Sequence, residues 1–556
     1  MSNQLASAIG IDMGTSRSVI AAAIRGGVEI LANEGSFRET PNTVVFGDVQ
    51  RFLGNEGVSK KKGNFKSTLE FFSRFLGMNS ESPDLAAEKA HVYCPTAFNE
   101  AGRLIFKPRY QGEQIEILPE QALATMLTKL RHVLELNNIT NKDVVMSVPS
   151  YYTQVERKLA LLAGRIAGLN IIKLMNESTA TVLNYGIFRK KDLSDDPRLV
   201  AFVDVGNSKT SITFAKVKKM GAEIVLEKTD RNLGGRDFDL LLFKEYQKRF
   251  ENKENMDLYE YPKSKMRLLD AIEKQRKTLS ANGEAPINVE YLCEDIDFAD
   301  VMTRDEFEKL CAPLLAKFGV LIKECFTEAG FTTKEFHSVE VIGGCTRTPA
   351  LQQMIQQTFA IDEVSRTLNQ SESIARGCAI QAAIKSPLFQ VAEYTIPERN
   401  VSKINCKYSV EKLGEGGIFE TKEYNNVLFK KNCEFPTVMT ISVSKATKAS
   451  LQLSYEEENP VHSQQMLVDV ETKPYKIKED EYKILLKGKI DDNGIIGLKC
   501  VELEETYLEE VKTLIKKKPE TKAEEIKREE AKKAEAKKTE EANGKTTAPV
   551  DGETKP

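Results

Sequence analysis

The chain has 556 residues, which favours two to four domains. Hydrophobic residues make up 41% and charged residues 29% of it, enough for large cores and a well-solvated surface. The net charge of only −3 gives no global field that would attract nucleic acid or a membrane surface, so we expect neither as a partner.

The spacing of the nine cysteines and four histidines argues against a zinc site. The cysteines form no CxxC pair and the histidines lie apart, so the pattern favours buried thiols in a reducing compartment over a zinc centre. The opening residues, MSNQLASAIGID, lack the charged start and the apolar run of a signal peptide, and no later run could span a bilayer. We therefore expect a cytoplasmic protein.

Residues 1–386 alternate strand-like and helical segments. The runs that predict strands are SVIAAAI (18–24), VEILA (28–32), DVVMSVP (143–149), LVAFVDV (199–205) and VEVIGG (339–344). The runs with helical periodicity are EQALATMLTKLRHVLEL (120–136), VERKLALLAGRIAGL (155–169) and a long segment at 302–330. This alternation predicts an α/β fold with mostly parallel central sheets.

A turn motif occurs twice in this part of the chain. IGIDMGTSRS (9–18) and FVDVGNSKTS (202–211) each join an apolar strand to a second strand through Asp-x-Gly and small polar residues. The matched pairs are Asp12 with Asp204, Gly14 with Gly206, Ser16 with Ser208 and Arg17 with Lys209. Such a turn offers backbone N–H groups and hydroxyls to a phosphate, and its aspartate can hold the water shell of a metal ion. One copy alone would be an ordinary hairpin turn, but two matched copies favour two related halves that grip the phosphates of a nucleotide from both sides.

A third segment, SVEVIGGCTRTPALQQMIQQTF (338–359), runs from a strand through Gly343 and Gly344 into a polar turn and then a helix. The base or ribose of a nucleotide can lie against the backbone of such a turn. An ordinary strand–helix connection has the same pattern, so this segment alone leaves both interpretations open.

Beyond residue 386 the pattern changes twice. PLFQVAEYTIP (387–397) has prolines at both ends and no helical period, which predicts a linker. Residues 398–511 alternate apolar and polar side chains, as in MTISVS and in the hairpin YKILLKGKIDDNGIIGLKC, and predict a small antiparallel β-sandwich. Residues 512–556 are rich in Lys, Glu and Ala without an apolar face, which predicts a charged, largely disordered tail.

Taken in order along the chain, these segments resemble the 70-kDa heat-shock chaperone superfamily. The resemblance rests on the two turns, on GLNIIKLMNESTATVLNYGIF (168–188), on LGGRDFD (233–239) and on IGGCTRTP. It implies an actin-like, two-lobed ATPase domain over 1–386, followed by the linker and by a β-sandwich that binds peptides.

Five further segments narrow the resemblance to the 110-kDa branch of that superfamily, here shortened at the C-terminus and without the helical lid. They are NEGSFRETP (33–41), GNS (206–208), GGRDFD with Arg236, LSANGEAP (279–286) and TLNQSESIARGCAIQAAIKSP (367–387). Members of this branch act as nucleotide-exchange partners of 70-kDa chaperones and as holdases.

The resemblance also implies a site, with ATP or ADP and magnesium as ligands. Asp12, Glu177 and Asp204 would orient magnesium-bound water and the attacking water. The phosphate contacts would come from Gly14, Thr15, Ser16, Gly206, Asn207 and Ser208, and the adenosine contacts from Glu273, Arg276, Lys277, Ser280, Gly344, Cys345 and Arg347. Pro149 and Arg157 match the interlobe switch of the family. Without the resemblance, residues 273–280 would be interpreted as a solvated helix face.

Three departures from the family pattern concern hydrolysis. The position of the catalytic lysine holds Ser73, and two aspartate positions hold Ser211 and Ser371. A serine cannot place an ammonium beside the γ-phosphate, where a cation usually contributes much of the stabilisation of phosphoryl transfer. Arg74 would take the place of the lysine only if the alignment shifted by one residue. We therefore expect ATP binding with weak or absent hydrolysis.

The leading interpretation is a co-chaperone that binds ATP, promotes nucleotide exchange on a 70-kDa heat-shock chaperone and holds unfolded or extended peptide segments. A ribosome-associated member of the superfamily with little ATPase activity is the first alternative. An actin-fold phosphotransferase is the second, although the β-rich module after residue 397 counts against it.

Overall fold

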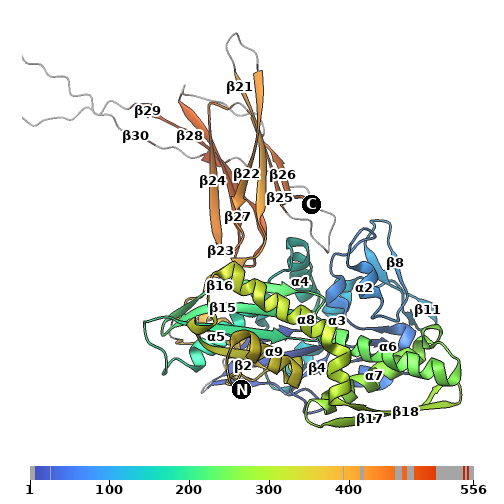
Figure 1. Cartoon of the computed structure of the whole chain (residues 1–556). Coiled ribbons are helices and arrows are strands. Elements are labelled where there is room, and N and C mark those ends of the chain that lie inside the picture. Colours follow the sequence, from blue (N-terminus) through green and yellow to red (C-terminus); the bar gives the residue numbers. More distant parts are fainter. Residues whose placement is uncertain are drawn as a thin grey trace, which may run out of the picture.

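The computed structural model describes residues 7–24, 27–391, 393–413, 419–446, 448–456, 466–472, 481–508, 543–544 and 548–549. Figure 1 shows an α/β body, on which a domain of long strands stands upright. The tail predicted for 512–556 lies outside the described residues, apart from two short strands, β30 (Asn543–Gly544) and β31 (Ala548–Pro549). Every helix in the described ranges is too short or too polar to cross a membrane.

The first lobe of the body is built on a mixed sheet in the order β13-β12-β1-β2-β3. Its strands are β1 (Ala8–Met13), β2 (Arg17–Ile24), β3 (Gly27–Ile30), β12 (Asp143–Val148) and β13 (Asn170–Asn176), and β4 (Thr40–Pro41) pairs with β2. The pairs β1–β12 and β12–β13 are parallel, whereas β1–β2 and β2–β3 are antiparallel.

The second lobe repeats this plan with the order β16-β15-β14-β19. Its strands are β14 (Arg198–Val205), β15 (Thr210–Lys218), β16 (Gly221–Asp230) and β19 (Phe336–Ile342). Only β14–β19 is parallel. The prediction of mostly parallel central sheets is therefore wrong. Each repeated turn is a tight hairpin, and a short turn can join only antiparallel neighbours, whereas parallel pairs need a long crossover.

Two helices lie between the sheets and hold the lobes together. α10 (Ser373–Lys385) covers β1, β2 and β12, and α5 (Glu177–Phe188) covers β15 and β16, while the two helices pack against each other. The helices cross so closely that a Cβ on Gly377 would lie 1.9 Å from the carbonyl oxygen of Ala180. Glycine is therefore required at this crossing.

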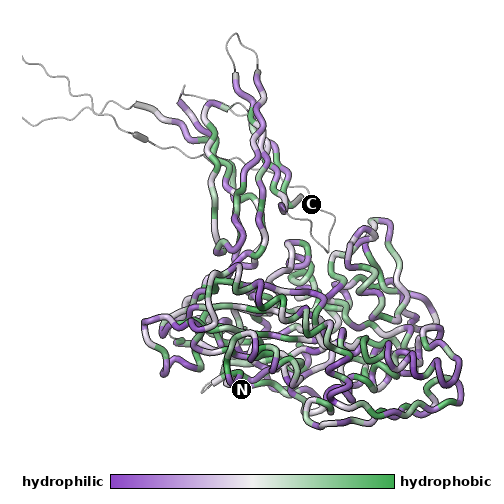
Figure 2. Tube along the Cα trace, in the orientation of Figure 1, coloured by the Kyte–Doolittle hydropathy of each residue, from purple (hydrophilic) through white to green (hydrophobic). Residues whose placement is uncertain are grey.

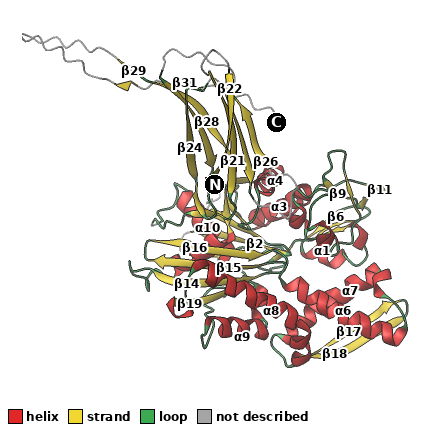
Figure 3. Cartoon of the chain, turned by 45° about the horizontal axis from the view of Figure 1, so that its top comes forward, coloured by secondary structure: helices red, strands yellow, loops and turns green. Residues whose placement is uncertain are grey.

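The remaining helices cover the outside of the sheets. They are α1 (Asn55–Lys60), α2 (Leu85–Lys89), α3 (Pro119–Leu136), α4 (Gln154–Ile166), α6 (Gly235–Glu254), α7 (Pro262–Leu279), α8 (Arg304–Ala329) and α9 (Pro349–Phe359). The start of α4 is fixed by its sequence, because Glu156 accepts hydrogen bonds from the N–H and the hydroxyl of Thr153 at 2.8 and 3.0 Å. Figure 3 shows α6 and α7 together with the hairpin of β17 (Glu284–Cys293) and β18 (Ile296–Thr303) at one corner of the body.

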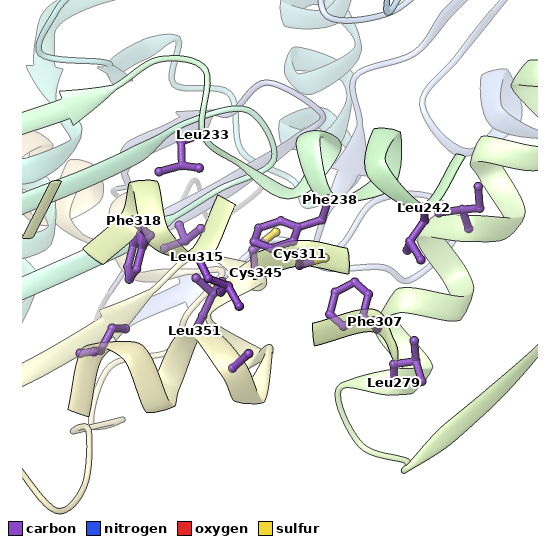
Figure 4. Packing of buried hydrophobic residues seen from close by; sticks show 14 of the residues in the cluster. Leu233, Phe238, Leu242, Leu279, Phe307, Cys311, Leu315, Phe318, Cys345 and Leu351 are labelled. Carbon is purple, nitrogen blue, oxygen red and sulfur yellow. The ribbon is translucent and has the colours of Figure 1, made fainter. Parts of the chain in front are cut away.

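Buried aromatic and aliphatic side chains form a continuous core in the second lobe. Figure 4 shows Phe238, Phe307, Cys311 and Cys345 gathered where α6, α8 and the turn after β19 meet. All nine cysteines are free thiols, and seven of them are buried. This agrees with the prediction of buried thiols, and among the described residues no cluster of ligands for a metal ion is present.

The upright domain consists of two antiparallel sheets. One has the order β22-β21-β25-β26 and the other β24-β27-β28-β31. The strands are β21 (Ile404–Leu413), β22 (Phe419–Phe429), β24 (Thr437–Ser444), β25 (Lys448–Tyr455), β26 (Met466–Glu471), β27 (Tyr482–Ile490) and β28 (Ile496–Glu505). Side chains from both sheets, among them Leu451 and Leu486, share one apolar core. Figure 2 shows the resulting alternation of hydrophilic and hydrophobic residues along these strands.

Within the segment predicted as a linker, 387–397, Tyr394 and Thr395 pack along the edge of β16. Thr395 pairs with Gly221, and its carbonyl oxygen accepts the N–H of Ala222 at 3.0 Å. Tyr394 is buried, and its hydroxyl donates to the carbonyl of Lys218 at 3.1 Å. The chain therefore reaches the upright domain along a fixed path over the second lobe.

One buried carboxylate joins the two lobes. Glu88, on α2, accepts hydrogen bonds from Arg74 at 2.9 Å and from Arg236, on α6, at 2.7 and 2.8 Å. Burial alone would raise the pKa of Glu88, but the two guanidinium groups outweigh it and lower the pKa to about 2. Lys61 forms a second contact between the lobes, with Asp270 at 3.0 Å.

Replacing Glu88 with glutamine should lower the free energy of unfolding by about 3 kcal/mol, because two arginines lose their buried counter-charge. A folded-state pKa below the ordinary value of 4.5 stabilises the fold above that value, and this stabilisation is lost as the pH falls towards 2. The difference between wild type and Glu88→Gln should therefore shrink between about pH 5 and pH 2.

Urea unfolding followed by circular dichroism at several pH values measures this difference. Glu324→Gln is the control, because Glu324 is half exposed and its ion pair with Lys228 should contribute less than about 1 kcal/mol. Equal effects of the two substitutions would show that Glu88 does not join the lobes.

Candidate functional site

The two repeated turns face each other across the middle of the body. Oγ1 of Thr15, after β1, lies 2.8 Å from Oγ of Ser208, after β14, although 193 positions separate them in the sequence. The N–H of Gly206 donates to the carbonyl of Lys209 at 2.9 Å and closes the second turn. In the first turn, a Cβ on Gly14 would lie 2.7 Å from a carbonyl oxygen of the same turn, so only glycine fits.

A cavity of about 450 Å³ lies beside this contact. Its volume falls within the range of small-molecule and cofactor sites. The predicted ligand-binding residues that line it are Asp12, Gly14, Thr15, Ser16, Glu177, Asp204, Gly206, Asn207, Glu273, Arg276, Lys277, Ser280, Gly344, Cys345 and Arg347. Ser208 is the exception, because it is fully buried in the wall, where it contacts Thr15.

Two half-buried aspartates line the cavity. Oδ1 of Asp12 accepts a hydrogen bond from the hydroxyl of Ser147 at 2.9 Å, yet burial raises its pKa to about 6. Burial and the negative charge of Asp12 raise the pKa of Asp204 to about 7. Gly343, with φ of +80°, packs so closely that a Cβ there would lie 2.5 Å from Oδ1 of Asp204.

Lys209 is a cavity residue that the sequence analysis did not assign to the site. Its side chain is 11% exposed, and its ammonium forms an ion pair with Glu177 at the start of α5. Burial lowers the pKa of Lys209 to about 8. The only signal in the sequence was its match to Arg17 in the repeat, which does not show which way the side chain points.

The helix α7 forms one side wall, and its charged residues have fixed partners. The guanidinium of Arg276 donates to both oxygens of Asp239, at 2.6 and 3.1 Å, so its plane is held by a bidentate contact. Lys277 pairs with Glu273 on the same helix, and the hydroxyl of Ser280 donates to the carbonyl of Lys277 at 2.6 Å. Asp239 was not predicted, and it positions Arg276 from α6.

The turn after β19 forms the opposite wall. A Cβ on Gly344 would meet no atom within 4 Å, so this glycine leaves open space at the cavity. Cys345 is buried with its sulfur 3.8 Å from Nη1 of Arg276, and Arg347 donates to Gln370 at 2.8 Å. Ser371, which replaces a family aspartate, also lines the cavity.

Neither Ser73 nor Arg74 supplies a cation to this cavity. Ser73 is buried in the 3-10 turn Phe72–Phe75, where its carbonyl accepts the hydroxyl of Tyr152 at 3.1 Å. The guanidinium of Arg74 binds Glu88, so Arg74 does not take the place of the family lysine. Ser211 contacts Thr229 at 2.8 Å on the neighbouring strand and is not part of the cavity wall.

The cavity fits a nucleotide better than it fits magnesium. In the described part of the chain, the buried Oδ1 of Asn207 has no hydrogen-bond partner and could accept one from a ligand or its water shell. The resemblance implies a magnesium ion held through water near Asp12, Glu177 and Asp204. Lys209 already pairs with Glu177 in that space, so its ammonium occupies one of the three carboxylates that would hold the water shell of the ion. The residues present therefore do not fit a resident magnesium ion.

The predicted switch residues lie where the body meets the upright domain. Pro149 is buried after β12, and Arg157 is buried on α4. The guanidinium of Arg157 donates to Oδ1 of Asn176 at 2.7 Å and to the carbonyl of Asn493, in the turn between β27 and β28, at 3.1 Å. Arg157 thus connects the end of β13, just before Glu177, to the upright domain.

Three more hydrogen bonds fix this contact between the domains. Oδ1 of Asn493 accepts the N–H of Leu174 at 2.8 Å. The hydroxyl of Tyr455 accepts the N–H of Gln154 at 3.0 Å, and Asn176 donates to the carbonyl of Arg399 at 3.2 Å. The upright domain is therefore bound to α4, which carries Arg157, and to β13, which Arg157 contacts through Asn176.

Replacing Asn493 with alanine should weaken the docking of the upright domain. The buried N–H of Leu174 loses its acceptor, which costs about 1–3 kcal/mol. Proteolytic cleavage within 387–397 should become about tenfold faster, because cleavage follows the population of the open form. Asp492→Ala is the control, since this neighbouring residue makes only a 3.5 Å contact with Lys385 and is half exposed. The same cleavage rate in both variants would contradict the assignment.

Comparison with known proteins places the chain in a family. The family model described as Hsp70 protein matches residues 8–553. Heat shock 70 kDa protein 14 of Arabidopsis thaliana is 32% identical over 502 residues, which are 89% of this chain and 60% of the relative. A heat shock protein homolog of Saccharomyces cerevisiae is 32% identical over 494 residues, 87% of this chain and 70% of the relative. The 97 kDa heat shock protein of Strongylocentrotus purpuratus is 33% identical over 504 residues, 89% of this chain and 56% of the relative. The chain thus spans about 60% of the first of these relatives.

Proposed function

The chain belongs to the Hsp70 protein family, in its 110-kDa branch, and from this premise we propose that it is an ATP-binding co-chaperone. It promotes nucleotide exchange on a 70-kDa heat-shock chaperone and holds unfolded peptide segments, and it acts in the cytoplasm. It holds ATP or ADP in the cavity between the two turns and hydrolyses ATP weakly or not at all.

The observation that carries the proposal is a nucleotide-sized cavity that has lost the family lysine. The two turns meet at Thr15 and Ser208, whereas Ser73 lies outside the cavity wall. Lys209 also neutralises Glu177, the carboxylate that the resemblance places near the attacking water. Such a site favours holding a nucleotide over phosphoryl transfer, because the position of the family lysine supplies no ammonium and the ammonium of Lys209 is engaged by Glu177. A co-chaperone that keeps its own nucleotide can stay closed while it is bound to the 70-kDa chaperone, and the 70-kDa chaperone can then release its ADP.

The contacts around Arg157 support a rigid, closed arrangement. Glu177 begins α5 directly after Asn176, which binds Arg157 and, through its amide, the carbonyl of Arg399. A ligand that orders Glu177 therefore also orders the residues that hold the upright domain. In this proposal the nucleotide stabilises the docked form, which is the form that binds the partner chaperone.

Peptide holding is supported by exposed apolar side chains on the upright domain. Tyr424 and Val427 on β22 and Val438 and Met439 on β24 are each about 40% exposed. Exposed apolar side chains can be covered when another chain binds, which removes them from water. They offer contacts to the apolar residues of an extended peptide.

Release of a fluorescent ADP analogue from a 70-kDa chaperone tests the exchange activity. We expect faster release when the chain is added with ATP, and loss of this effect in Gly206→Asp. A Cβ at position 206 meets no atom closer than 3.6 Å, so the fold tolerates the substitution, but the added carboxylate repels phosphate inside the cavity. Gly63→Asp, at an exposed position with its nearest contact at 3.9 Å, should act as wild type.

No acceleration by the wild-type chain would contradict the exchange proposal. Co-sedimentation with ribosomes would then favour the ribosome-associated alternative. Acceleration that is equal for wild type and Gly206→Asp would show that exchange does not depend on this cavity.

A further inference from the structure

Lys209 and Arg17 occupy the same position in the two turns but point in different directions. The side chain of Arg17 is 46% exposed and lies 3.7 Å from Glu39 at the rim of the cavity. The side chain of Lys209 is 11% exposed and pairs with Glu177 inside the cavity. The inward direction of Lys209 is therefore a property of this turn and does not follow from the repeat.

The ammonium of Lys209 lies in the space that the resemblance gives to magnesium. Asp12, Glu177 and Asp204 line the same cavity as Lys209. An ammonium is a compact charge with three donors, so it can bind carboxylate and phosphate oxygens at the same time. By pairing with Glu177 it also reduces the negative charge that would attract a divalent cation, and charges in a buried site are screened little by salt.

Two other cations of the cavity wall have ion partners of their own. Arg276 is held by both oxygens of Asp239, and Lys277 by Glu273 on its own helix. Lys209 is the cation whose partner, Glu177, belongs to the carboxylate group itself. Ser73, at the position of the family lysine, lies in the 3-10 turn Phe72–Phe75, and the ammonium beside Glu177 comes from Lys209 on the turn between β14 and β15.

We propose that the Lys209 ammonium replaces magnesium as the counter-charge of the nucleotide phosphates, so that the chain binds ATP and ADP without a divalent cation. This inference rests on the proposed nucleotide site and adds which group of the chain neutralises the negative charge of the phosphates there. Phosphates that enter between the two turns share the ammonium with Glu177. Since the counter-charge is part of the chain, it cannot leave the site with the nucleotide.

Binding of a fluorescent ADP analogue to the full chain, with magnesium and then with EDTA, tests this. The wild-type affinity should differ by less than about threefold between the two buffers. Lys209→Met keeps the length of the side chain but removes its charge, so binding in EDTA should weaken about tenfold or more, and magnesium should restore it. Lys209→Arg keeps the charge and should still bind in EDTA. The gel-filtered wild-type complex should carry far less than one magnesium per chain.

Lys218→Met, at an exposed position near the end of β15, is the matched control and should bind as wild type in both buffers. Circular dichroism shows whether each variant is folded. Loss of wild-type binding in EDTA would overturn this inference and leave the nucleotide site in place. Equal binding of wild type and Lys209→Met in EDTA would overturn it as well. No binding in either buffer would overturn both the nucleotide site and the role of Lys209.

Discussion

The contact between Thr15 and Ser208 is the constraint on which the site depends. It joins the hairpin turn after β1 to the hairpin turn after β14 at 2.8 Å, and these turns belong to different sheets. They can meet because α5 and α10 pack between the sheets with almost no space, as the fit of Gly377 against Ala180 shows. The cavity is thus fixed by the packing of the lobes, and the residues around it are arranged by elements that are far apart in the sequence.

Charge in this cleft is distributed differently from the pattern that the resemblance implies. Arg74 and Arg236 share Glu88 on the outer side, where they stabilise the closed lobes. Lys209 faces inward and pairs with Glu177. One buried ion-pair network therefore holds the lobes together, and a second one prepares the cavity for an anionic ligand. The second network is the one on which the proposed retention of nucleotide rests.

The sequence predicted what local patterns determine. The two turns follow from the Asp-x-Gly pattern, whereas the residues of the cavity wall were assigned through the family resemblance. The sequence analysis wrongly predicted mostly parallel strands in the central sheets, because the hairpins at the two turns impose antiparallel pairs. The side chain of Lys209 points into the cavity, where it pairs with Glu177. Glu88 contacts Arg236, which lies 148 positions further along the chain. No local signal reports such contacts, since packing between distant elements decides them.

A crystal structure of the chain with ADP, grown in EDTA, tests the central claim most directly. The account predicts the phosphates between the turns at Gly14–Ser16 and Gly206–Ser208, with Nζ of Lys209 in hydrogen-bond contact with a phosphate oxygen and no metal ion beside Asp12. Nucleotide bound elsewhere, or phosphates that leave Lys209 on Glu177 and recruit a metal ion, would contradict it.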